Sequence, residues 1–213
     1  MSGKKLTIES SGGLILEAEL DRSSEPRAAL VICHAHPRMQ GTMKSPLLLA
    51  VRDAVMERNW TALRFNFRGV GGSQGEFGDG VDEVEDALAA ARFVRSEHHD
   101  APIAILGWSF GAAVAIRAAA REAEIEACVA VAPAVVATPG VTRGLPPPGD
   151  LAIDAPLLVV CGANDEVTPP EHARRWAEEA GARYEEIGAA NHFFWAKYDP
   201  LVAAVTKFLD ESV

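Results

Sequence analysis

A serine in the pentapeptide 107–111 (GWSFG) has the surroundings of an enzyme nucleophile. The pentapeptide joins an apolar segment, 103–106, to a run of small residues, 112–120. The order strand, G-x-S-x-G, helix puts the serine on a sharp turn, with its hydroxyl exposed at the carboxyl edge of a sheet. Glycines at both ends suit a strained turn packed against a helix, where a Cβ has no room. The pattern predicts that Ser109 is a nucleophile.

A second match to the same pattern lies at 71–75 (GGSQG) and contains Ser73. The residues that follow it, 76–80 (EFGDG), favour a loop, so no helix begins there and Ser73 is predicted to be a bystander. A dinucleotide-binding interpretation of this loop fails because G-x-G-x-x-G would need glycine where Gln74 stands.

A serine hydroxyl needs an adjacent base, and the base needs a third group to fix its tautomer. His192 follows the last predicted strand and precedes the last helix, which places it at the carboxyl edge of the sheet. His34 and His36 follow an earlier strand and are expected near the same edge. The remaining histidines are predicted to face solvent: His98, His99 and His172.

Asp165 is the candidate for the orienting acid, because it follows the apolar strand 156–161. Its neighbour Glu166 is the alternative. Asp150 and Asp154 precede that strand and are expected at the opposite edge. The chain order Ser109, Asp165, His192 is one of the orders in which serine, acid and histidine triads occur.

Eight strands and five helices are predicted to position these groups. The strands cover 6–10, 14–20, 29–33, 61–67, 103–106, 127–132, 156–161 and 184–187, and the helices begin near Pro46, Val81, Ala112, Pro170 and Pro200. After an initial hairpin, strands alternate with helices, which favours an α/β fold with a mostly parallel sheet. Active sites in such sheets lie beyond the carboxyl ends of the strands.

The composition is that of an ordinary globular chain, and 213 residues suit one domain over 1–213. The net charge of −10 argues against nucleic-acid and anionic-membrane partners. No apolar run is long enough to span a membrane, and residues 1–9 lack a signal core, so we expect a cytoplasmic protein. Cys33, Cys128 and Cys161 adjoin apolar runs and are predicted to be buried, reduced thiols.

Nearly the whole chain resembles the α/β-hydrolase superfamily. More narrowly, segments 33–43 (CHAHPRMQGTM) and 65–71 (FNFRGVG) resemble a group of small bacterial serine hydrolases, although that group usually has proline at the position of Ala35. The resemblance implies an eight-stranded, mostly parallel sheet flanked by helices. It also implies that the loop after the third strand supplies half of the oxyanion hole.

Pro37 has no N–H, so the backbone N–H of His36 is the expected oxyanion donor, together with that of Phe110. The side chains of His34 and His36 would then hold the loop through hydrogen bonds. A metal site at this His-x-His is not expected, because no third ligand stands at a suitable spacing. No cofactor is expected either.

Four large aromatic side chains flank the candidate catalytic residues and suggest a hydrophobic acyl or alcohol pocket: Trp108, Phe193, Phe194 and Trp195. Arg68 is either structural or a contact for an anionic substrate. The interval between Ala132 and Pro156 is too short for a helical cap. We therefore expect a minimal cap or none, and an open pocket that suits short acyl groups.

Together these patterns predict a serine hydrolase that cleaves small carboxylic esters or thioesters through an acyl-enzyme. Cleavage of peptides or amides and acyl transfer use the same groups, and a hydrolase-fold binding protein without catalysis is a further alternative. The expected partner is a small acyl substrate, bound by a monomer or a homodimer.

Overall fold

The eight strands form one sheet in the computed structural model, which describes residues 3–213. Residues 1 and 2, which belong to the predicted domain and N-terminal segment, lie outside the described residues. The strands are β1 (Lys4–Glu9), β2 (Ile15–Asp21), β3 (Ala28–Cys33), β4 (Trp60–Phe65), β5 (Ile103–Trp108), β6 (Ile125–Val131), β7 (Leu157–Gly162) and β8 (Arg183–Ile187). Their order is β1-β2-β4-β3-β5-β6-β7-β8. The pairs β1–β2 and β2–β4 are antiparallel and the others are parallel, which confirms the predicted sheet.

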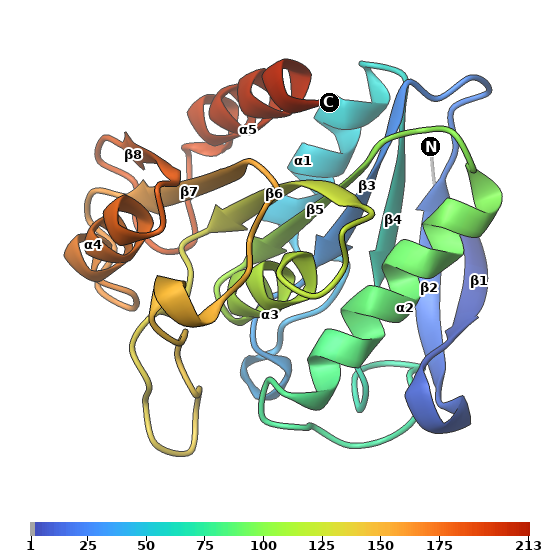
Figure 1. Ribbon diagram of the computed structural model, residues 1–213, viewed down its shortest axis with the longest axis horizontal. Coiled ribbons are helices and arrows are strands. Elements are labelled where there is room, and N and C mark those ends of the chain that lie inside the picture. The colour runs from blue at the N-terminus through green and yellow to red at the C-terminus, as the bar shows by residue number, and fades with distance from the viewer. Residues whose placement is uncertain (1–2) are drawn as a thin grey trace.

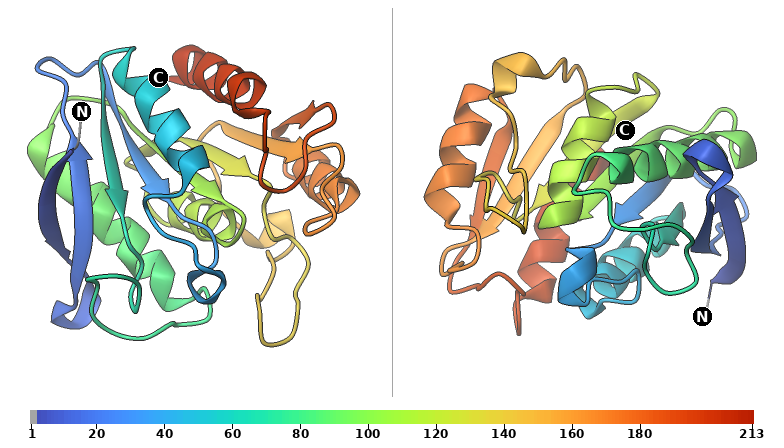
Figure 2. Two further views of the ribbon diagram at one scale, coloured as in Figure 1. Left: turned by 180° about the vertical axis from the view of Figure 1, so that it is seen from behind. Right: turned by 90° about the horizontal axis from the view of Figure 1, so that it is seen from below.

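Five α-helices cover both faces of this sheet (Figure 1). They are α1 (Pro46–Met56), α2 (Asp82–Glu97), α3 (Phe110–Ala119), α4 (Pro170–Glu179) and α5 (Tyr198–Ser212). Apolar side chains of α2, α3 and α4 pack in the cluster on one face, and those of α1 and α5 in the cluster on the other. Figure 2 shows the two helix layers from behind and from below. None of the helices in residues 3–213 is long and apolar enough to cross a membrane.

The central strands are apolar on both faces because both faces are covered. Every residue of β3, β4, β5 and β7 is buried. Continuous apolar runs of this kind are typical of parallel strands between two helix layers. Cys33, Cys128 and Cys161 are buried and form no disulfide, as predicted.

Strand β4 ends two residues earlier than predicted. The backbone N–H of Asn66 still donates to the carbonyl of Glu17, but its side-chain oxygen accepts from the N–H of Met43, at 2.9 Å in both cases. The chain turns at this polar residue, so the loop that follows β4 begins at Asn66. Helix α3 begins at Phe110, immediately after Ser109 and two residues before its expected start.

The connection between β6 and β7 contains no α-helix, as expected for a minimal cap. Its only helical turn is the 3₁₀ segment Pro148–Asp150, and its regular pairing is limited to one bridge between Thr138 and Thr142. Figure 1 shows this connection in yellow as an open loop beside α3. The carboxyl edge of the sheet is therefore not covered by a helical domain.

Candidate active site

Ser109 occupies the strained turn between β5 and α3, with φ of 57° and ψ of −115°. An L-residue rarely adopts this left-handed backbone, and such strain tends to occur at functional sites. A Cβ on Gly107 would lie 2.0 Å from the carbonyl oxygen of Gly111, and one on Gly111 would lie 2.3 Å from that of His34. Only glycine fits at either position, so the sequence pattern is a packing requirement of the turn.

The imidazole of His192 lies between Ser109 and Asp165. Its Nε2 is 3.1 Å from Ser109 Oγ, and its Nδ1 is 2.8 Å from Asp165 Oδ2. A carboxylate can only accept, so Nδ1 carries the proton and Nε2 is left to accept from the serine hydroxyl. All three residues are at least nine-tenths buried. Three strand ends supply the three groups: β5 for the serine, β7 for the acid and the β8–α5 connection for the histidine.

The carboxylate of Asp165 is held by four donors. Its Oδ1 accepts from the N–H groups of Val167 and Thr168 at 2.9 and 2.8 Å, and its Oδ2 accepts from the Thr168 hydroxyl at 2.9 Å as well as from His192. Burial alone would raise the pKa of Asp165, but the hydrogen bonds from His192 and Thr168 outweigh it and hold that pKa below its ordinary value. Glu166, the alternative acid, is exposed to solvent. Thr168 is not among the site residues that we predict from the sequence.

The backbone N–H groups of His36 and Phe110 have no acceptor among residues 3–213. Both residues contribute to the walls of the cavity at Ser109, where an oxyanion would form. Their side chains pack together, with ring centroids 5.0 Å apart. Free N–H groups beside a serine hydroxyl are suited to bind a developing negative charge.

The side chains of His34 and His36 hold the loop after β3. His34 Nε2 accepts from the N–H of Phe67 at 3.0 Å and Nδ1 donates to its neighbour's carbonyl, while burial lowers its pKa to about 4 and keeps the ring neutral. His36 Nδ1 accepts from the N–H of Arg38, and Nε2 donates to the carbonyl of Val141 at 2.6 Å. His36 thereby ties this loop to the β6–β7 connection.

Two cavities open from Ser109. One, of about 380 Å³, lies against the β6–β7 connection and the start of α4, and its walls include Val135, Val136 and Val141. The other, of about 410 Å³, lies against the β8–α5 connection, and its walls include Trp108 and Phe193. The valine-lined cavity has no counterpart in the sequence analysis, because its residues come from a loop with no motif.

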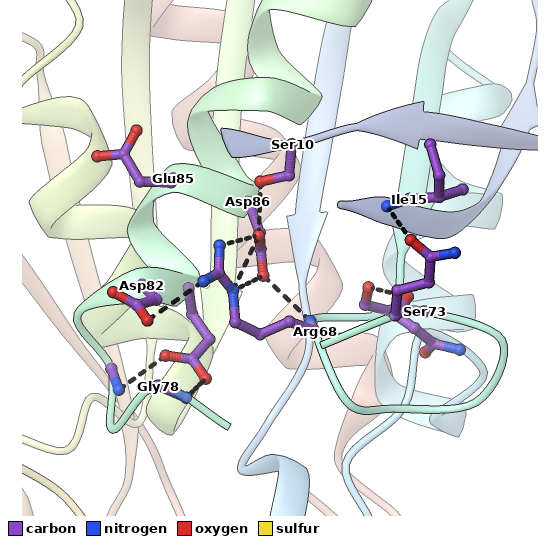
Figure 3. Close-up of polar contacts among 12 residues, drawn as sticks. Ser10, Ile15, Arg68, Ser73, Gly78, Asp82, Glu85 and Asp86 are labelled. Atoms are coloured by element: carbon purple, nitrogen blue, oxygen red, sulfur yellow. Dashed lines mark hydrogen bonds and ion pairs between the residues drawn. The ribbon is translucent and has the colours of Figure 1, made fainter. Parts of the chain in front are cut away.

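Arg68 lines neither cavity, which corrects its place among the candidate pocket residues. Its guanidinium binds the buried carboxylate of Asp86, with Nη2–Oδ1 and Nε–Oδ2 distances of 2.7 and 3.0 Å, and Ser10 Oγ donates to the same carboxylate (Figure 3). Burial would lower the pKa of Arg68, but Asp86 and Asp82 raise it above its ordinary value. A buried charge requires such a partner, and Asp86 binds it from inside α2.

Phe194 is also corrected, because its side chain is fully buried in the core and lines neither cavity. Its neighbours Phe193 and Trp195 point the other way, with exposed fractions of 39% and 65%, and both line the cavity of about 410 Å³. The left-handed backbone of Phe194, with φ of 53°, separates the inward ring from the two outward ones.

Comparison with known proteins identifies the fold and the family of the chain. Residues 24–151 match the family described as serine aminopeptidase, S33. An uncharacterised protein of Rickettsia prowazekii (strain Madrid E) is 29% identical over 203 residues, which cover 91% of this chain and 84% of that protein.

Two solved structures are similar over nearly their whole length. A Xanthomonas campestris protein described as a serine α/β-hydrolase without a lid is 27% identical, with a TM-score of 0.83, over 98% of this chain and 94% of that chain. A homologue of α/β serine hydrolases from Coxiella burnetii is 29% identical, with a TM-score of 0.83, over 97% of both chains.

Proposed function

The chain belongs to the serine aminopeptidase S33 family of α/β-hydrolases, and on this premise we propose that it cleaves small carboxylic esters or thioesters through an acyl-enzyme. The proposal rests on two hydrogen bonds of His192. Its Nε2 is 3.1 Å from Ser109 Oγ, and its Nδ1 is 2.8 Å from Asp165 Oδ2. A serine, an imidazole and a carboxylate in this geometry form the triad of acyl transfer.

In the first half of the proposed reaction, His192 Nε2 takes the proton of Ser109 as Oγ bonds to the substrate carbonyl carbon. The N–H groups of His36 and Phe110 stabilise the oxyanion. As the carbonyl re-forms, the bond from carbon to the leaving oxygen or sulfur breaks, and His192 gives its proton to that atom. Water then attacks the acyl-enzyme with His192 as base, which releases the acid and restores Ser109.

Esters and thioesters are favoured over N-terminal peptides by the charges in the site. An aminopeptidase binds a substrate ammonium group, for which a carboxylate is the natural partner. Among the residues of 3–213 that line the two cavities there is no aspartate or glutamate. The carboxylate of Asp165 is already occupied by four donors. The walls therefore suit an uncharged acyl substrate.

A labelling experiment followed by a substrate panel tests the proposal. We expect a fluorophosphonate probe to modify Ser109, and hydrolysis to be faster with esters or thioesters than with aminoacyl amides. Because the edge is open, little of a long chain is buried, so kcat/KM is expected to peak at short acyl groups. Absence of labelling, or a preference for aminoacyl amides, would refute the ester assignment.

A further inference from the structure

The two cavities that open from Ser109 differ in their access to the proton donor. They share His36, Met39, Ser109 and Val167, so they meet at the proposed nucleophile. Only the cavity against the β8–α5 connection includes His192 in its walls. The walls of the other cavity come from the β6–β7 connection and the start of α4, and they do not include His192. A substrate that spans the site therefore places its two halves in different surroundings.

In the proposed mechanism, this difference decides which half of the substrate each cavity holds. The imidazole that deprotonates Ser109 must next protonate the leaving oxygen, and a proton donor must lie within hydrogen-bond distance of the atom that it serves. The leaving group consequently belongs in the cavity that His192 lines. The acyl group is then directed toward Val135, Val136 and Val141.

The cavity lined by His192 is aromatic, whereas the other is mainly aliphatic. The rings of Phe193 and Trp195 are stacked, with centroids 4.9 Å apart and an interplanar angle of 16°. Phe193 also meets Trp108 and His192 edge-on, at 6.0 and 5.4 Å. Phe193 thus contacts the imidazole of His192, and Trp195 stacks on the side of Phe193 toward the solvent.

The backbone around Phe194 keeps the rings of Phe193 and Trp195 exposed. Phe194 is anchored in the core with φ of 53°, and its carbonyl accepts from the N–H of Lys197 at 2.8 Å. Ala196 also has a left-handed backbone, with φ of 58°. Two strained residues cost free energy, and their effect is to turn Phe193 and Trp195 outward beside the catalytic groups. An exposed apolar patch at a cavity is typical of a ligand-binding surface.

We infer that the stacked pair Phe193–Trp195 binds the leaving group, and that the preferred substrates are esters of planar aromatic alcohols with aliphatic acids. An aromatic ring favours a second ring in an offset-stacked arrangement, beyond the gain from buried area. A larger planar leaving group should cover more of the pair. The inference rests on the proposed acyl-enzyme mechanism and adds the substrate class.

Phenyl butyrate and 2-naphthyl butyrate separate ring size from chemical reactivity, because the two alcohols are similarly acidic and both esters give the same butyryl-enzyme. We expect the wild-type protein to hydrolyse the naphthyl ester with about ten-fold higher kcat/KM. In Trp195→Leu this ratio should fall to about two, because the naphthyl ester loses more of its stacking contact than the phenyl ester does. Phe193→Leu should act in the same direction.

Two control variants shorten apolar side chains elsewhere. Val136→Ala, in the aliphatic cavity, should alter the dependence on acyl length from acetate to hexanoate and leave the naphthyl-to-phenyl ratio as it is. Val81→Ala removes an exposed side chain that lines neither cavity and should change neither quantity. Labelling by the fluorophosphonate verifies that each variant retains an intact site.

The outcomes distinguish this inference from the proposed function. If no ester is hydrolysed and Ser109 is not labelled, the proposed function itself fails. If esters are hydrolysed but the ratio is the same in wild type and Trp195→Leu, the leaving-group assignment is overturned. If Trp195→Leu changes the acyl-length dependence instead, the aromatic cavity holds the acyl group.

Discussion

The two G-x-S-x-G segments of this chain have the same pattern and nearly the same burial, but different surroundings. Ser73 and Ser109 each have an exposed fraction of 9%. Ser73 Oγ donates to the carbonyl of Asn66 at 2.6 Å and accepts from the N–H of Glu17 at 2.9 Å. Ser109 Oγ has an imidazole nitrogen as its partner. Burial therefore does not distinguish the proposed nucleophile from the other serine, whereas the partners of the hydroxyl do.

The glycines of the two segments also serve different purposes. At Gly107 and Gly111 an added Cβ would meet backbone atoms. At Gly71 it would meet the side-chain ends of Asn66 and Glu17, both at 2.6 Å, and φ is 57°. The first pair permits close packing of a strand against a helix, and the second segment is a polar turn that joins β2 to the loop after β4. A pattern of residue types does not by itself distinguish these uses.

The largest expected effect is the loss of reaction in Ser109→Ala. Turnover should fall by about a million-fold, because the oxyanion donors and substrate binding alone would remain. Fluorophosphonate labelling, read by mass spectrometry, should disappear. Ser73→Ala is the matched control and should retain labelling and most activity. Modification of Ser73 in the wild-type protein would reverse the roles that we assign to the two segments.

Asp165→Asn is expected to lower turnover by about ten-thousand-fold, since an amide can stabilise the wrong tautomer of His192. Glu166→Gln, one residue further on, should have almost no effect because that side chain is exposed. Steady-state kinetics on one ester compare the two variants. Near-normal turnover in Asp165→Asn would mean that another group orients the imidazole. Neither substitution should change the hydrogen bonds of Ser73 with Asn66 and Glu17.

Gly111→Ala should lower the free energy of unfolding by about 3 kcal/mol, because the new Cβ meets a backbone carbonyl that cannot move independently. Gly71→Ala should cost about 1 to 2 kcal/mol, since the neighbouring side-chain ends can shift and the left-handed backbone is the main penalty. Urea unfolding followed by circular dichroism measures both. Equal losses would show that the two turns are equally constrained.

The smallest effect concerns Ser73 itself. Ser73→Ala should lower the free energy of unfolding by about 1 kcal/mol, because the Asn66 carbonyl and the Glu17 N–H lose their partner in a buried turn. The decrease should appear in urea unfolding while kcat/KM stays close to that of the wild type. An unchanged stability would indicate that water replaces the hydroxyl there.

Several features of the site were determined by local sequence. The apolar segment before Ser109 and the small residues after it are sufficient to specify a strand, a sharp turn and a helix, because sheet and helix periodicities and glycine conformations are local properties. The strand preceding Asp165 and the short connection after β6 were determined in the same way. These local signals were also enough to predict the sheet type and the absence of a large cap.

Other features were decided by the tertiary structure alone, because they depend on residues far apart in the chain. The guanidinium of Arg68 was ambiguous until Asp86 was seen to bind it from inside α2. The opposite directions of Phe194 and Trp195 depend on backbone angles within an irregular connection. The valine-lined cavity forms where the β6–β7 connection meets the start of α4. Periodicity and motifs record which residues share a strand or helix, whereas long-range packing decides which charges pair and which rings line a cavity.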